Sequence, residues 1–305
     1  MAIISVFPSP IGTPIASAVA LAAAGDVVLV NDGTYPEPAV TVATSNVKII
    51  AKHEGAAIRQ GLNAATSAFI VTAAAGVEIN GFTIQNYTAD AIDVTAGTNH
   101  RIIGNTINNT LGIGIDLAAG TGHVAWRNSV QDAGGAAGIN VVSTDSWIVQ
   151  NVSFSNTSVG ILLAGANNAA IGNTVSQNGT IGISSTAANN LLFGNTVSQN
   201  GTSGITVAAA NNVLIRNNVE NNTGNGISIT TGGDNGYLGA NDSDENTQTG
   251  IAIGATFNSV EFNEMEFNKN FGLVISGNEN TAFGNRFTGN TPTQLSITGT
   301  DNNLF

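Results

Sequence analysis

Two aspartates in the first half of the chain, Asp93 and Asp116, are the first candidates for chemistry. They hold equivalent places in two similar phrases, Ala91-Ile-Asp-Val94 and Gly114-Ile-Asp-Leu117. If these phrases form neighbouring strands, the two carboxylates lie about 4.8 Å apart. Carboxylates that close together can share a proton or bind a cation. We therefore expect acid/base or metal-binding chemistry at this pair.

Two of the three histidines and two arginines fall in the same stretch of sequence. An arginine there can neutralise substrate charge, and a histidine can transfer protons. The predicted catalytic residues are Asp93, Asp116, Arg101, Arg127, His100 and His123. The alternative is structural: His100 and His123 occupy a column that holds asparagine elsewhere, and Asp/Arg pairs on neighbouring strands are ordinary cross-strand pairs.

A second group of carboxylates recurs in the later part of the chain. Glu220, Asp244 and Glu266 form one column, and Asp242 and Glu264 form another. Because Ca²⁺ prefers oxygen ligands, these five residues are the predicted metal site, and Ca²⁺ is the one cofactor considered; none is required. The spacing matches neither an EF-hand nor a nonapeptide calcium repeat, so a solvated acidic face is the alternative.

A repeat of 22–24 residues positions all of these side chains. The thirteen residues from Ile171 to Ile183 recur almost unchanged from Phe193 to Ile205. Within each copy of the phrase Gly-Ile-x-apolar, buried and polar types alternate, which is typical of a strand with one buried face. A period of this length predicts a solenoid, in which one coil alone cannot bury its apolar face.

Asparagine recurs in columns between the expected strands. Asparagine tolerates left-handed backbone conformations at corners, and stacked amides can bond to the copies above and below. The main column contains Asn105, Asn128, Asn151, Asn173, Asn195, Asn217, Asn241, Asn263 and Asn285. The pattern predicts an all-β parallel β-helix of about 11–12 coils. A leucine-rich horseshoe is disfavoured, because no Leu-x-x-Leu-x-Leu frame or helical repeat is present.

The repeat, together with a predicted helix, an apolar strand and the segment Gly33–Glu37, resembles the right-handed parallel β-helix (pectate-lyase-like) superfamily. This superfamily includes pectate lyases, polygalacturonases and the β-helix maturation proteins of nitrous oxide reductase. The resemblance implies a right-handed solenoid whose enzymes carry their sites on the outer face. It specifies function poorly, because lyases, hydrolases, epimerases, tailspikes and non-catalytic proteins share the fold. The sequence contains no Asp-Asp, Asp-Pro-His or Arg-x-Lys motif.

The expected organisation is an N-terminal strand and capping α-helix over residues 1–38, followed by one continuous β-helix over residues 39–305. Thr13-Pro14 is a helix-start signal, and the helix should cover the exposed edge of the first coil. At the other end, residues 294–305 begin a further coil. Either the last loop folds over this end or the end stacks on another chain.

Composition limits the partners. The 305 residues carry a net charge of −12 with eight Lys plus Arg, which disfavours nucleic acid and unassisted binding of polyanions. There is no apolar run of about 18 residues, so no membrane insertion is expected. The first basic residue is Lys48, so there is no recognisable signal peptide.

The favoured function is a rigid, non-catalytic surface or structural protein. It would lie outside a cell or on a cell, spore or virion surface, and would bind polysaccharide or further copies of itself. The low charged fraction of 9%, the regular repeat and the missing catalytic motifs support this interpretation. The alternative is a polysaccharide lyase, glycoside hydrolase or epimerase that acts on the outer face of the early coils.

Overall fold

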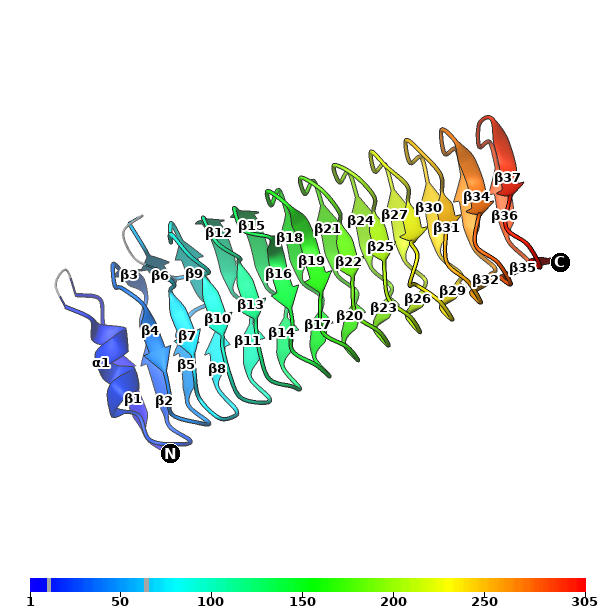
Figure 1. Cartoon of the computed structure of the whole chain (residues 1–305). Helices are drawn as coiled ribbons and strands as arrows, with labels where there is room; N and C mark the ends of the chain where they lie inside the picture. Colours follow the sequence, from blue (N-terminus) through cyan, green and yellow to red (C-terminus); the bar gives the residue numbers. More distant parts are fainter. Residues whose placement is uncertain (10–11, 63–65) are drawn as a thin grey trace. The chain divides into compact units, whose positions relative to one another are not determined.

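The computed structural model describes residues 1–9, 12–62 and 66–305 (Figure 1). It is an all-β parallel β-solenoid with three parallel sheets and one short helix, which confirms the predicted fold class. The chain divides into two compact units, an N-terminal unit (residues 1–157) and a C-terminal unit (residues 158–305). Within each unit the chain visits the three sheets in turn, once per coil.

The N-terminal unit contributes strands to all three sheets. The first sheet contains β1 (Ile3–Val6), β2 (Val27–Val30), β5 (Lys48–Ala51), β8 (Glu78–Asn80), β11 (Arg101–Ile103), β14 (Val124–Trp126) and β17 (Trp147–Val149). The second contains β4 (Val40–Val42), β7 (Phe69–Val71), β10 (Ile92–Val94), β13 (Ile115–Leu117) and β16 (Ala137–Val141). The third contains β3 (Gly33–Tyr35), β6 (Ala57–Gln60), β9 (Phe82–Gln85), β12 (Thr106–Thr110), β15 (Ser129–Ala133) and β18 (Val152–Phe154).

The C-terminal unit follows the same order. Its first sheet contains β20 (Ala169–Ile171), β23 (Leu191–Phe193), β26 (Val213–Ile215), β29 (Tyr237–Gly239), β32 (Ser259–Glu261), β35 (Thr281–Phe283) and β38 (Asn303–Leu304). The second contains β19 (Val159–Leu163), β22 (Ile183–Ser185), β25 (Ile205–Val207), β28 (Ile227–Ile229), β31 (Ile251–Ile253), β34 (Phe271–Ile275) and β37 (Thr293–Ile297). The third contains β21 (Thr174–Ser176), β24 (Thr196–Ser198), β27 (Asn218–Glu220), β30 (Asp242–Asp244), β33 (Glu264–Glu266) and β36 (Arg286–Thr288).

The first sheet has seven strands in each unit, so there are more coils than the predicted 11–12. The difference arises at the start of the chain, where β1 and β2 already pair in parallel register, Ile3 opposite Val27. These early coils lack the Gly-Ile-x-apolar phrase, so the repeat period alone does not reveal them.

The predicted capping helix is α1 (Pro14–Leu21), which packs against β1, β2 and β4. Its first free N–H groups, those of Ile15 and Ala16, donate to the carboxylate of Glu37 at 3.0 and 3.1 Å. Thr13 makes no side-chain cap hydrogen bond, so Glu37 takes the role that the sequence predicts for Thr13. No helix in the described part of the chain is long and apolar enough to cross a membrane.

Buried asparagines form hydrogen-bonded ladders within each unit, as predicted. In the N-terminal unit, the backbone N–H and the side-chain amide of Asn105 both donate to Asn128 Oδ1, at 2.9 and 3.1 Å. In the C-terminal unit, Asn195 donates to Asn217 Oδ1 in the same way, at 3.1 and 2.9 Å. A second ladder there contains Asn178, Asn200, Asn222, Asn246, Asn268 and Asn290.

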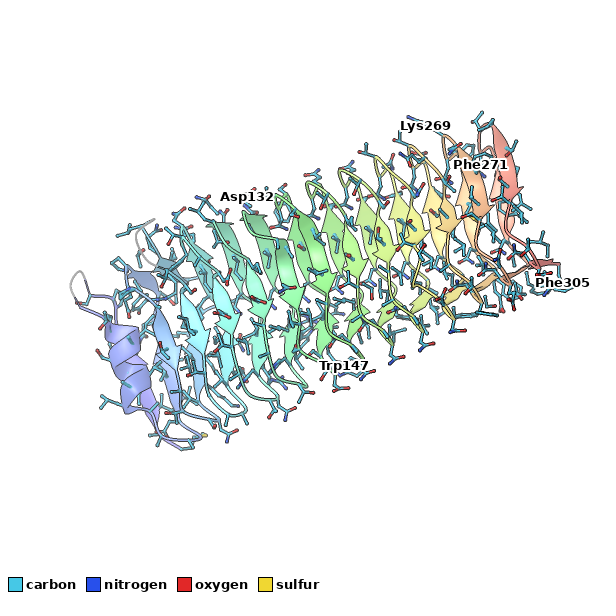
Figure 2. All side chains as sticks on the ribbon, in the orientation of Figure 1. Asp132, Trp147, Lys269, Phe271 and Phe305 are labelled. Atoms are coloured by element: carbon cyan, nitrogen blue, oxygen red, sulfur yellow. The ribbon has the colours of Figure 1, made fainter. Side chains whose placement is uncertain are left out.

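The last residues extend the sheets. Residues 294–305 contribute most of β37 and all of β38, which pair with β34 and β35. They do not fold over the end as a covering loop, and the side chain of Phe305 is exposed (Figure 2). A cavity of about 200 Å³ opens here between Leu295, Leu304 and Phe305 among others.

Candidate functional site

The outer face of β10 and β13 brings Asp93 and Asp116 together as predicted. The two residues are direct partners in neighbouring strands, and Asn140 on β16 follows Asp116 in the same column. Ile92 and Val94 on either side of Asp93 are fully buried, so the alternation points both aspartates outward, where they are half-buried. Asn140 Nδ2 donates to Asp116 Oδ1 at 2.9 Å.

A third carboxylate, Asp90, joins the pair. One oxygen from each of Asp90, Asp93 and Asp116 lies within 4.8 Å of the others, and no other such group of His, Cys, Asp or Glu occurs among the described residues. Asp90 accepts the backbone N–H of Ile113 at 2.6 Å, which turns its side chain toward the next coil. Sequence reasoning missed Asp90 because it precedes the alternating phrase. Gly112 makes room for it, since a Cβ at Gly112 would overlap the Asp90 carboxylate.

Crowding changes the acidity of this carboxylate trio (Asp90, Asp93 and Asp116). Burial raises the pKa of Asp116 to about 6, the hydrogen bond from Asn140 lowers it, and the charges on Asp90 and Asp93 raise it. Burial and the neighbouring Asp90 also raise the pKa of Asp93. The trio therefore favours holding a proton below about pH 6, with Asp116 the best placed to carry it.

Of the two arginines of the predicted catalytic set, Arg101 lies on a different sheet from the aspartates and Arg127 lies at a corner that follows a strand of that sheet. Arg101, on β11, is 3.8 Å from Glu78 on the neighbouring strand. Arg127 follows β14, where its guanidinium lies 4.5 Å from the Trp126 ring centroid. In the part of the chain that the structure describes, neither arginine forms an ion pair with Asp93 or Asp116. The structure thus favours the cross-strand role that was the alternative for Arg101.

The two histidines lie inside the solenoid. Both are fully buried, and their rings stack with centroids 5.0 Å apart. Nδ1 of His100 accepts the N–H of Val77 at 3.0 Å, and Nδ1 of His123 accepts the N–H of His100 at 3.1 Å. Each Nε2 lies about 3 Å from a carbonyl oxygen, that of Ala96 or Ala119 (3.0 and 2.9 Å).

These contacts are the ones that ladder asparagines make in other coils. Nδ1 replaces the amide oxygen, and Nε2–H replaces the amide donor. Burial lowers the pKa of both imidazoles, which are neutral at physiological pH. The structure therefore supports a structural role for His100 and His123, while their catalytic role stays a prediction that their burial does not favour.

The acidic columns of the C-terminal unit are in the predicted register. Glu220 is opposite Asp244, which is opposite Glu266, and Asp242 is opposite Glu264. Arg286 on β36, which the sequence analysis did not consider, lies 2.9 Å from Glu264 and 3.8 Å from Glu266. Burial and the adjacent Asp242 raise the pKa of Asp244 to about 7. Calcium binding by these five residues stays a prediction.

A family model described as "Right handed beta helix region" matches residues 67–213 and 138–305. The chain belongs to this family of right-handed parallel β-helix proteins, as the sequence resemblance implied. No curated protein matches it.

Several solved structures have the same fold as this chain, although their sequence identity to it is low. The A-module of mannuronan C-5 epimerase AlgE4 from Azotobacter vinelandii has a TM-score of 0.77 at 13% identity, over 96% of this chain and 94% of that one. Alginate lyase AlyF-OU02 has a TM-score of 0.67 at 13% identity, over 98% of this chain and 88% of that one. The catalytic unit of a GH87 alpha-1,3-glucanase from Streptomyces thermodiastaticus strain HF3-3 has a TM-score of 0.66 at 14% identity, over 98% of this chain and 68% of that one. At this identity the likeness shows the fold alone.

Proposed function

We propose that the protein acts on a polysaccharide at the outer face of β10 and β13, where the carboxylate trio supplies a proton donor and a base. The observation that carries this proposal is the convergence of three carboxylates within 4.8 Å, with the pKa of Asp116 raised to about 6. Acid/base cleavage of a glycosidic bond usually depends on two neighbouring carboxyl groups with different pKa values.

Asp116 is assigned the acid/base role and Asp93 the role of nucleophile. Protonated Asp116 would donate its proton to the leaving oxygen while ionised Asp93 bonds to the anomeric carbon as the glycosidic bond breaks. Water would then attack the anomeric carbon, give a proton to Asp116 and release Asp93 as a carboxylate, which restores both groups. Burial first, and then the charges on Asp90 and Asp93, raise the pKa of Asp116 and so maintain its proton below about pH 6. The close approach of the carboxyl groups fits the short separation of retaining glycosidases better than the wider one of inverting enzymes.

A neutral glycan suits this face better than a polyuronate. No arginine or lysine forms an ion pair with the trio among the described residues, and the whole chain carries a net charge of −12. A polyuronate would need a bridging cation here.

The test is an assay for new reducing ends and unsaturated products on a panel of neutral glucans and polyuronates, the latter with and without Ca²⁺. We expect release from a neutral glucan by the wild type, and loss of at least about 100-fold in rate in Asp93→Asn/Asp116→Asn, which is the usual scale of acid/base catalysis. The melting temperature should change little. Equal turnover by the variant would refute the proposal.

A rigid scaffold that binds glycans or its own copies without catalysis is the second candidate. The asparagine ladders in both units favour a scaffold, because hydrogen bonds between buried asparagine side chains join each coil to the next and stiffen the solenoid. Under either function we place the protein outside the cell or on its surface. Light scattering would test self-association: a self-associating scaffold predicts oligomers that disappear on deletion of residues 294–305, and a monomer at high concentration would contradict self-association.

A further inference from the structure

The outer face of the first sheet is apolar in the C-terminal unit. Half-buried apolar side chains point outward from β20, β23 and β26, namely Ile171, Leu191, Phe193, Val213 and Ile215. The matching strands of the third sheet, β21 and β24, carry polar residues on their outer face, namely Thr174, Ser176, Thr196 and Ser198. An apolar face on an otherwise polar surface is a feature of interaction surfaces.

The next strand of the first sheet, β29, adds an aromatic ring that lies flat on this face. A Cβ at Gly239 would overlap the ring of Tyr237, so that ring lies along β29 over the glycine and does not stand out from the sheet. The Tyr237 hydroxyl donates to Glu261 Oε2 at 3.4 Å. Because the ring is flat, a second sheet can approach this part of the face at the usual distance of about 10 Å.

A cation and a carboxylate lie on opposite sides of β29. Arg216 directly follows β26 and is exposed, while Glu261 ends β32, where buried Val260 turns it outward. Since β26 and β32 are the two neighbours of β29, each charge lies about one strand spacing, 4.8 Å, to one side of it. In the part of the chain that the structure describes, neither charge forms an ion pair.

This arrangement makes the face complementary to itself. A two-fold axis along β29 exchanges the two sides of that strand and keeps the strand direction. In a face-to-face pair of copies, Arg216 of one copy would therefore oppose Glu261 of the other. Phe193 on β23 would oppose Phe283 on β35 in the same way, because both strands lie two places from β29. The two Tyr237 rings would meet at the axis.

We propose that the outer face of the first sheet in the C-terminal unit is a dimer interface, and that its partner is a second copy of this chain. Charge complementarity selects a second copy, because the cation and the carboxylate are symmetric about β29 while the net charge of −12 makes other faces repel. The exposed corner residues Asn189 and Asn211 supply a polar rim. A symmetric interface of this kind closes, so assembly stops at the dimer.

The size of the face sets the expected affinity. The six strands from β20 to β35 span about 24 Å, and three residues with one corner residue give a width of about 13 Å. The projected area is about 300 Å², which is smaller than the roughly 800 Å² per partner of a standard interface. We therefore expect a weak dimer, with a dissociation constant above about 1 μM.

The experiment is sedimentation velocity of the full chain, from about 1 μM to 1 mM, with the charge reversals Arg216→Glu and Glu261→Arg. Glutamate suits the corner at Arg216, because Glu245 and Glu279 adopt the same left-handed φ at other corners of this unit. Each reversal alone places like charges opposite each other in the dimer, whereas an equimolar mixture of the two variants restores opposite charges at both contacts. Lys269→Glu, which reverses an exposed cation away from the first sheet, is the control with the same net charge as Arg216→Glu.

We expect the wild type and Lys269→Glu to form dimers of similar affinity, and each single reversal to dimerise at least about tenfold more weakly. The equimolar mixture should dimerise within about threefold of the wild type. Asp93→Asn/Asp116→Asn should dimerise like the wild type, which separates this proposal from the acid/base site.

Three results would overturn the proposal. The first is a wild type that stays monomeric at about 1 mM. The second is single reversals that associate as tightly as the wild type, which is what assembly through residues 294–305 predicts. The third is an equimolar mixture that associates no more tightly than its components.

Discussion

Replacing the stacked histidines by the residue of the neighbouring ladder, as His100→Asn/His123→Asn, should remove an acid-sensitive element from the N-terminal unit. Protonation would place a hydrogen on each Nδ1, the atom that now accepts a backbone N–H from Val77 or His100. Because the rings are fully buried and only 5.0 Å apart, two positive charges there would also repel each other.

The sign and size follow from proton linkage. The folded-state pKa of each histidine lies below the unfolded value of about 6.5, so below that pH the unfolded chain binds more protons than the folded one. Stability therefore falls with decreasing pH, by up to about 1.4 kcal/mol per pH unit for each histidine. Because an unfolded histidine is half protonated at pH 6.5 and about nine-tenths protonated at pH 5.5, the loss for the pair between these values is at most about 2 kcal/mol.

The carboxylates with raised pKa act in the opposite direction. Folded Asp116 and Asp244 keep protons at a pH where the unfolded chain has lost them, so their contribution to stability grows as pH falls through about 6 and 7, respectively. The histidine effect must consequently be read as the difference between the wild type and the double variant.

Urea unfolding followed by circular dichroism at pH 7.5, 6.5 and 5.5 gives this difference. The wild type should lose more stability than the double variant as the pH falls below 6.5, while the two proteins differ little in pH dependence above it. Parallel curves for both proteins from pH 7.5 to 5.5 would refute the assignment of the two rings to the interior ladder.

Three further predictions concern the ladder and the carboxylate trio. Asn195→Ala removes four hydrogen bonds of 2.9–3.0 Å and should destabilise the chain by at least about 3 kcal/mol in urea unfolding, whereas exposed Thr196→Ala should change stability by about 0.5 kcal/mol or less. Asp90→Asn removes the charge beside Asp116 and should lower the pKa of Asp116 in a carboxyl titration; an unchanged titration would show that Asp90 has no part in it. Ca²⁺, if it binds the trio, competes with a proton, so its affinity by calorimetry should fall between pH 7.5 and 5; an affinity independent of pH would place the ion elsewhere.

The repeat made the fold predictable. Each coil repeats the same alternation and the same corner asparagines, so the parallel register of Asp93 with Asp116 could be derived by counting residues. The acidic columns of the C-terminal unit followed in the same way. Local spacing is sufficient here because neighbouring coils in sequence are also neighbours in space.

Features outside the alternating phrase were not predictable in this way. Asp90 reaches the pair only because a corner turns it toward Ile113 and because Gly112 leaves space. The arginines are near the aspartates in sequence, but the corner between β10 and β11 puts Arg101 on another sheet, and Arg127 lies beyond β14 of that sheet. For His100 and His123, the corner column that they share with asparagine predicted their structural role correctly. At an interior corner, the shape and hydrogen-bonding pattern of the side chain decide its role, and the frequent use of histidine in catalysis does not.

The account depends on a raised pKa of Asp116, which holds a proton at the outer face of β10 and β13 below about pH 6. A ¹³C NMR titration of the aspartate carboxyl carbons, assigned by comparison with Asp116→Asn, measures this directly. We expect one carboxyl that is absent from the variant and titrates with an apparent pKa of about 6. If every assigned aspartate of the trio instead titrates near the ordinary value of about 4, the proposed acid/base site is wrong.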